Sequence, residues 1–136
     1  MQPRRPPRIS QVVTRGGDDG TTGLANGTRI MKDSPRIEAI GTVDELNSLI
    51  GMVRSFGIPS STDQLLEQVQ QTLFSVGGEL AFPGRQLLQD EQVVALEQRL
   101  RDLNAELPPL TEFVLPGGPP AAAACQLARA VCRRAE

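Results

Sequence analysis

Histidine, tryptophan and tyrosine are absent from this chain of 136 residues, and only two cysteines are present. Without histidine there is no Ser-His-Asp triad, no Cys-His pair, no imidazole base and no imidazole metal ligand. Two cysteines cannot complete a four-thiolate zinc site within one chain. The four phenylalanines are the whole aromatic content, which argues against a base-stacking surface for nucleic acid. The chemistry left belongs to Arg, Lys, carboxylates and backbone N–H groups, and we expect a bound cofactor to supply the reactivity.

Charge and hydropathy exclude further classes of partner. The chain has 14 Lys and Arg against 16 Asp and Glu, a net charge of −2, which does not indicate a nucleic-acid binder. It has no run of about 18 apolar residues, so we expect neither a transmembrane helix nor a membrane partner. The basic, proline-rich segment Met1–Arg8 has no apolar region after it and is not a secretory signal.

The two cysteines bear on the compartment. Cys125 and Cys132 fall in one predicted helix, where seven residues of rise separate their Cα atoms by about 10 Å. A disulfide needs a Cα separation of roughly 4.4–6.8 Å, so the pair cannot be bridged within that helix. We therefore expect a reducing compartment: the cytoplasm of a bacterium, or the mitochondrial matrix if the source is eukaryotic.

The pattern of apolar residues predicts an all-α fold, an antiparallel helix bundle without a convincing strand. We expect a flexible arm over 1–13, a glycine-rich loop over 14–28, and helices over about 34–55, 61–81, 90–107 and from 121 onward. Asp90 is the predicted cap of the third helix. The last helix reaches Glu136 without a stop signal, so we expect the domain to be truncated at its C-terminus. The apolar stripes of the first three helices are Val43, Leu46, Leu49, Ile50 and Val53; Leu65, Val69, Leu73, Val76 and Leu80; and Val93, Leu96, Leu100, Leu103 and Leu107.

The glycine-rich loop is the first candidate site. Glycines at 16, 17 and 20 free the backbone to turn N–H groups toward an anion, while threonine hydroxyls and Arg15 add donors and positive charge. These features suit a polyphosphate, although the Walker A pattern is absent. Composition alone favours the plainer interpretation, a surface loop without a ligand.

Charged residues on two helices are the second candidate. Arg129 and Arg133 lie one helical turn apart, with Glu136 on the same face, and two such guanidiniums make a rigid anion clamp. An ordinary solvated face is about as consistent with this spacing. Arg134 is expected to point to solvent or to a neighbouring chain. Asp44 lies opposite the apolar stripe of its helix, either as surface charge or as a carboxylate that orients an arginine of another subunit.

Five blocks in order resemble the PduO-type ATP:cob(I)alamin adenosyltransferase family. The resemblance covers roughly residues 12–136, and the Val-Asp-Glu-Leu-Asn and Cys-Arg-Arg-Ala-Glu sequences are its most specific parts. The blocks are Thr14–Leu24, Arg29–Asp33, Gly41–Ser48, Phe113–Gly118 and Ala128–Glu136.

The resemblance implies a fold and an activity. The fold would be a ferritin-like bundle of five helices, with the last helix missing here, that forms homotrimers with active sites between subunits; the domain would span 14–136. The activity would be transfer of the 5′-deoxyadenosyl group of ATP to cob(I)alamin, in which cobalt of a four-coordinate corrin attacks the ribose C5′ and triphosphate leaves. Mg²⁺ would bind the ATP phosphates without side-chain ligands. A reductase and a cobalamin-dependent enzyme are implied partners. The alternative is a non-catalytic carrier or sensor of ATP or adenosylcobalamin.

The resemblance also assigns residues. Asp44 would pair with Arg129 of the neighbouring subunit, and both are implied as catalytic. Phe113, which is also implied as catalytic, would press on the lower face of the corrin and exclude its axial ligand. The residues implied in ATP binding are Thr14, Arg15, Gly17, Asp18, Gly20, Thr22, Lys32, Arg129, Arg133 and Glu136.

Overall fold

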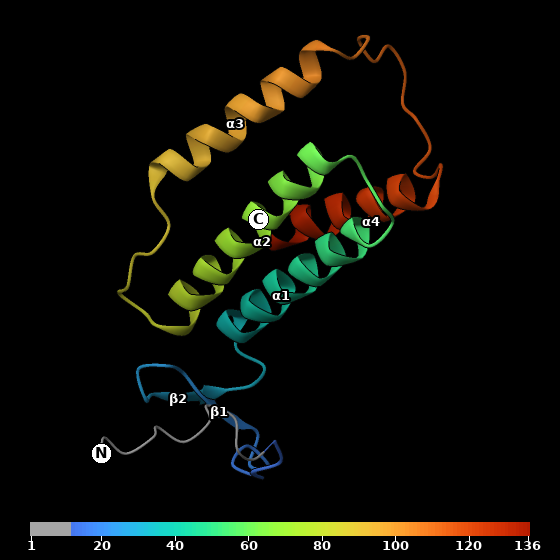
Figure 1. Ribbon diagram of the computed structural model, residues 1–136. Helices are drawn as coiled ribbons and strands as arrows, with labels where there is room; N and C mark the ends of the chain where they lie inside the picture. Colours follow the sequence, from blue (N-terminus) through green and yellow to red (C-terminus); the bar gives the residue numbers. More distant parts are fainter. Residues whose placement is uncertain (1–11) are drawn as a thin grey trace, which may run out of the picture.

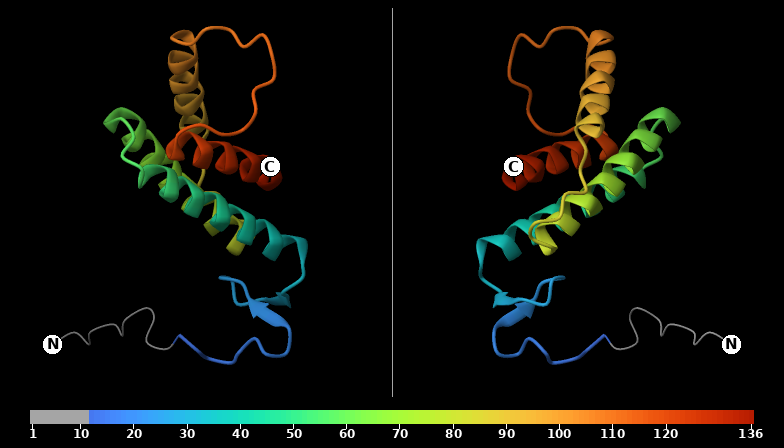
Figure 2. Two further views of the ribbon diagram at one scale, coloured as in Figure 1. Left: turned by 90° about the vertical axis from the view of Figure 1, so that its right-hand side faces the viewer. Right: turned by 90° about the vertical axis from the view of Figure 1, so that its left-hand side faces the viewer.

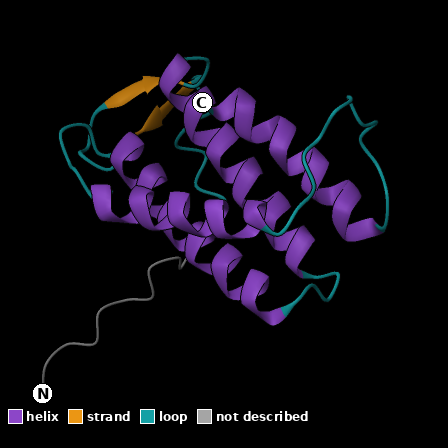
Figure 3. Ribbon diagram, turned by 90° about the horizontal axis from the view of Figure 1, so that it is seen from above, coloured by secondary structure: helices purple, strands orange, loops and turns teal. Residues whose placement is uncertain are grey.

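The computed structural model of the chain describes residues 12–136 and is predominantly helical, with a small sheet near its N-terminal end (Figures 1 and 3). The helices confirm the predicted fold class, and their bounds lie close to the predicted ones. Residues 1–11 of the predicted arm lie outside the described part. The elements are β1 (Thr21–Gly23), β2 (Arg29–Met31), α1 (Pro35–Arg54), α2 (Ser60–Ala81), α3 (Asp90–Ala105) and α4 (Pro120–Ala135).

The expectation of a strand-free segment over 14–28 is wrong. β1 and β2 pair antiparallel, with Thr22 opposite Ile30. The return between them is closed by a hydrogen bond of 2.8 Å from the Leu24 N–H to the Thr28 carbonyl, and Gly27 adopts a φ of 85° there. A hairpin of three residues per strand is held by its turn and its backbone bonds. It is too short to show the alternating hydrophobicity by which strands are recognised.

α1 is the central helix of the bundle. It begins where the Ser34 hydroxyl accepts the Ile37 N–H at 3.4 Å, with proline at its first position, as the sequence predicted. Its apolar stripe packs against α4 and α2, which both run antiparallel to it. The buried cluster consists of Leu46, Ile50, Ala128 and Val131, and Leu49, Leu66, Val69 and Leu73 pack around it. The small side chains of Ala124 and Ala128 let α4 approach α1 closely.

α3 stands away from the other three helices (Figures 1 and 2). Its N-cap is Gln89, whose backbone N–H donates to the side-chain oxygen of Gln92 at 2.9 Å; the predicted cap, Asp90, is the first helical residue. The five residues of its apolar stripe remain 42–65% exposed. Among the described residues, no helix combines the length and apolarity needed to cross a membrane.

Candidate functional site

The glycine-rich loop has a distinctive backbone. Arg15 adopts a φ of 57°, a value that residues other than glycine rarely adopt. Gly20 has a φ of 83°. Two turns follow each other: the Asp18 N–H donates to the Arg15 carbonyl at 3.3 Å, and the Gly20 N–H to the Gly17 carbonyl at 3.2 Å. Strained backbone of this kind gathers at functional sites. The loop therefore has a defined shape, which the interpretation as a plain surface loop does not require.

Lys32 reaches back across this loop from the end of the hairpin. Its N–H donates to the Gly20 carbonyl at 3.0 Å. A Cβ placed on Gly17 would lie 2.9 Å from both the Lys32 ammonium and the Thr21 carbonyl oxygen, so only glycine fits at this position. The structure thus brings together Gly17, Gly20 and Lys32, three of the residues predicted to bind ATP.

Arg29 organises the same loop, and the sequence reasoning missed its role. Its guanidinium donates to the Gly16 carbonyl at 2.6 Å and to the Thr21 carbonyl at 3.2 Å. It also lies 3.5 Å from the Asp19 carboxylate. The backbone and hydroxyl of Thr21 donate to Asp19, and with Arg29 these contacts hold the pKa of that carboxyl below its ordinary value. The role of Arg29 follows from its position on β2, and that position could be recognised only once the hairpin was known.

Asp44 is exposed on α1 and lines a hollow of about 380 Å³ with Ser48 and Phe74. Below it, two amides tie α1 to α2: Asn47 donates to the Gln70 carbonyl at 3.2 Å, and Gln70 donates to the Asn47 carbonyl at 2.9 Å. Within the described residues, Asp44 forms no ion pair. Its carboxylate is therefore available to a group from outside the chain.

The end of α4 is attached to α1 by Arg134. Its guanidinium binds the Glu45 carboxylate, donates to the Thr42 hydroxyl at 3.4 Å and lies 3.9 Å from Glu38. The prediction that Arg134 points to solvent or to another chain holds in part: half of its side chain is exposed, and the antiparallel packing of α4 on α1 also places two carboxylates within its reach. This attachment fixes the helical turn that carries Arg133.

The other charged residues of α4 remain exposed. Arg129 donates to the Gln126 side chain at 3.0 Å. In residues 12–136, neither Arg133 nor Glu136 makes a side-chain hydrogen bond or ion pair, so the predicted anion clamp is open to solvent. None of these three side chains bonds to the glycine-rich loop within the described chain.

Phe113 lies apart from the glycine-rich loop. Its side chain is fully exposed on the segment between α3 and α4. In both side views this segment lies at the opposite end of the molecule from the hairpin (Figure 2). A single chain therefore presents the predicted ATP residues and the predicted corrin residue as separate surfaces.

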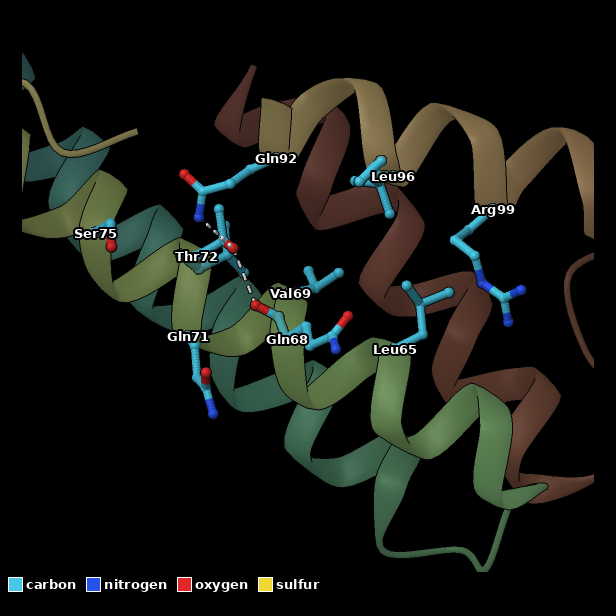
Figure 4. Close-up of a pocket in the computed structure, with 11 residues that line it drawn as sticks. Leu65, Gln68, Val69, Gln71, Thr72, Ser75, Gln92, Leu96 and Arg99 are labelled. Atoms are coloured by element: carbon cyan, nitrogen blue, oxygen red, sulfur yellow. Dashed lines mark hydrogen bonds between the residues drawn. The ribbon is translucent and has the colours of Figure 1, made fainter. Parts of the chain in front are cut away.

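A second hollow holds none of the predicted site residues. It has a volume of about 540 Å³ and lies between α2 and α3, with Leu65, Val69 and Leu96 on its apolar wall (Figure 4). Gln92 donates to the Thr72 hydroxyl at 3.4 Å across one end. Residues 12–136 contain no group of three or more His, Cys, Asp or Glu that could hold a metal ion.

Known proteins resemble this chain in sequence and fold. Residues 12–136 match the family described as cobalamin adenosyltransferase. The chain is 50% identical over 130 residues to the cobalamin adenosyltransferase of Cupriavidus metallidurans, covering 95% of this chain and 71% of that protein. It is 39% identical over 131 residues to the corrinoid adenosyltransferase PduO of Citrobacter freundii, covering 92% of this chain and 39% of that much longer protein. A variant PduO-type ATP:corrinoid adenosyltransferase from Lactobacillus reuteri, complexed with cobalamin and ATP, superposes with a TM-score of 0.83 at 34% identity, covering 92% of this chain and 74% of that one.

Proposed function

Because this chain belongs to the cobalamin adenosyltransferase family, we propose that it transfers the 5′-deoxyadenosyl group of ATP to cob(I)alamin, giving adenosylcobalamin and triphosphate. The observation that carries the proposal is the family match over residues 12–136, which includes every residue that the resemblance implicates. The shape of the glycine-rich loop and its contact with Lys32 support it independently, because they create a cationic backbone cradle suited to a polyphosphate.

We assign binding of the triphosphate of ATP to Lys32, Arg129 and Arg133. Lys32 stands over the loop at Gly17, and Arg129 with Arg133 forms an exposed pair one turn apart on α4. Fixed cations of this kind stabilise the charge that develops as triphosphate leaves. Thr14, Arg15, Asp18 and Thr22 line the loop, and Glu136 ends the helix that bears the arginines. We assign Mg²⁺ to the phosphates of ATP, where phosphate oxygens and water would be its main ligands.

The chemical step needs no side-chain nucleophile, in keeping with a chain without histidine. The Co(I) substrate supplies the electron pair of the new cobalt–carbon bond to C5′, and the bond from C5′ to the triphosphate oxygen breaks. Its electron pair departs with triphosphate, while cobalt rises formally to Co(III). The protein holds the two substrates in line and stabilises the leaving group.

Phe113 is assigned to the corrin. The fully exposed Phe113 ring is followed by the exposed side chains of Val114 and Leu115, and a contiguous apolar surface of this kind suits contact with a ligand. Placed against the lower face of the corrin, the ring leaves an axial ligand no room. A four-coordinate cobalt is more easily reduced to Co(I), which links this side chain to turnover rather than to ATP binding.

The separation of these surfaces within one chain supports a homotrimer with composite sites. Asp44 has no ion-pair partner in the described chain, and the α3–α4 segment lies at the far end from the hairpin (Figure 2). In a symmetric ring, one protomer can supply Asp44 and its neighbour Arg129. We assign the enzyme to the cytoplasm, where a reductase delivers electrons and a cobalamin-dependent enzyme takes up the product.

The direct test mixes the full chain with ATP, Mg²⁺ and chemically reduced cobalamin and follows the absorbance of cob(I)alamin. Conversion to the spectrum of adenosylcobalamin, with one triphosphate released per turnover, is the expected result. If no conversion occurs, the catalytic proposal is overturned. Tight binding of adenosylcobalamin by calorimetry without turnover would then identify a carrier or sensor.

A further inference from the structure

The C-terminal end of α2 is bound from two directions. The Arg36 guanidinium, in the first turn of α1, donates to the Leu80 carbonyl at 2.9 Å. The Ala25 N–H, in the return of the hairpin, donates to the Ala81 carbonyl at 2.9 Å. Two segments distant from α2 in sequence therefore meet at neighbouring carbonyls of one helix end. We call these two bonds the α2 clasp.

The end of α2 is suited to receive such donors. The last carbonyls of a helix have no partner within the helix and carry partial negative charge. The last turn of α2 contains no basic residue of its own. The Arg36 guanidinium and the Ala25 N–H supply hydrogen bonds to these carbonyls, and the guanidinium also supplies positive charge at the helix end.

The hairpin depends on such ties for its position. No residue from 12 to 34 is buried, so the segment has no apolar anchor in the core. Among the described residues, Ala25 makes the one backbone hydrogen bond between the hairpin and a helix other than the adjoining α1. A segment with few buried contacts opens locally at low cost unless polar bonds hold it.

The same segment carries the groups that shape the glycine-rich loop. Arg29 and Lys32 both bind the loop, and both lie on the hairpin or directly after it. The orientation of the loop relative to the helices therefore follows that of the hairpin. Whatever fixes the hairpin against α2 also aims the loop.

We propose that Arg36 is a positioning residue for the ATP site: by binding the end of α2 beside Ala25, it keeps the hairpin and its loop preorganised for the triphosphate. The inference rests on the proposed function for its ligand, although the clasp itself concerns the free chain. Arg36 does not touch ATP. Its effect is on affinity, because an ordered loop loses less entropy when it binds.

The test compares Arg36→Met, which keeps an unbranched side chain but removes the donors, with Arg36→Lys, which restores one cationic donor. Arg85→Met is the matched control, because Arg85 is exposed just beyond α2 and makes no side-chain bond in the described chain. Hydrogen exchange of the free protein is measured over residues 15–31, and the KM for ATP and kcat are measured with reduced cobalamin.

Arg36→Met is expected to speed exchange in 15–31 and to raise the KM for ATP, each by about threefold to tenfold, which is the effect of losing one solvent-exposed hydrogen bond. The kcat should stay within about twofold of the wild type. Arg36→Lys should recover part of both effects, and Arg85→Met should show neither.

Unchanged exchange in 15–31 would overturn the clasp whether or not the protein uses ATP. If Arg36→Met lowers both kcat and the thermal midpoint but leaves the KM for ATP unchanged, Arg36 has only a general structural role, and the proposal is overturned. A wild-type protein that neither binds ATP nor turns over would refute the proposed function instead, while the exchange result would still stand on its own.

Discussion

The Lys32 ammonium occupies the space that a methyl group on Gly17 would need. A Cβ at Gly17 would lie 2.9 Å from Lys32 Nζ and equally close to the Thr21 carbonyl oxygen. The lysine side chain can swing away, but the carbonyl belongs to β1 and cannot move without disturbing the hairpin. The close approach of Lys32 to the loop thus depends on the missing side chain at Gly17.

Gly17→Ala is therefore expected to weaken ATP binding by about tenfold, through displacement of the Thr21 backbone and of the ammonium. Isothermal calorimetry with ATP and Mg²⁺ measures the change, and circular dichroism checks that the helices persist. Gly16→Ala is the control, because its Cβ would meet only the Thr14 hydroxyl at an ordinary 3.5 Å. Equal losses in the two variants would argue against the contact between Gly17 and Lys32.

Asp44 and Arg129 are predicted to act across a subunit boundary. Asp44→Asn and Arg129→Gln should each abolish most of the activity when present in every subunit. Refolding the two inactive variants together should restore about one quarter of wild-type activity, the statistical share of interfaces that receive both native side chains. A mixture that stays inactive, while size analysis confirms mixed trimers, would contradict the shared site.

Phe113→Ala should lower the turnover number by at least about tenfold when the assay starts from cob(II)alamin and a reductant, while the affinity for ATP, measured by calorimetry, changes by less than about twofold. The reason is that the ring is proposed to face the corrin rather than the nucleotide. Because the ring is fully exposed in the chain, its removal should leave the unfolding midpoint unchanged. Leu110→Ala tests whether any exposed apolar residue of the α3–α4 segment behaves in the same way. Parallel losses of turnover and ATP affinity would refute the role given to Phe113.

Glu79 links stability to pH. Its carboxylate accepts the N–H of Leu88 at 2.5 Å and that of Leu87, and these bonds hold the pKa of Glu79 below its ordinary value of 4.5. A depressed pKa means that the ionised group stabilises the fold above about pH 4.5, and that this contribution is lost as the pH falls through the folded-state pKa. Glu79→Gln should thus lower the urea midpoint of unfolding near pH 7. At about pH 3 the difference in midpoint from the wild type should be smaller.

Glu112→Gln is the control for this pH effect, since Glu112 lies on an exposed segment and accepts no backbone hydrogen bond in the described chain. Its urea midpoint should follow that of the wild type at both pH values. A deficit in Glu79→Gln that is equally large at low pH would assign the effect to side-chain shape rather than to charge.

Much of the helical framework could be predicted from local signals. Ser34 and Pro35 mark the start of α1, and regular apolar spacing marks α2 and α3, because capping and periodicity act within a few residues. The site was predictable in part as well: the glycines of the loop and the arginine pair of α4 stood out by composition and spacing. The hairpin did not, because its three-residue strands depend on bonds to each other rather than on their own sequence.

The positions of Arg29, Arg36 and Arg134 were decided by tertiary structure. Each binds a partner beyond its own helical turn or strand: Arg29 the loop at Gly16, Arg36 the end of α2, and Arg134 a carboxylate on α1. In the sequence all three resemble ordinary surface charge. Helix boundaries and the apolar stripe of α1 follow from short-range physics already present in the amino-acid order. Which arginine orders the loop and which stays exposed follows only from the way antiparallel packing and the hairpin bring distant carbonyls and carboxylates together.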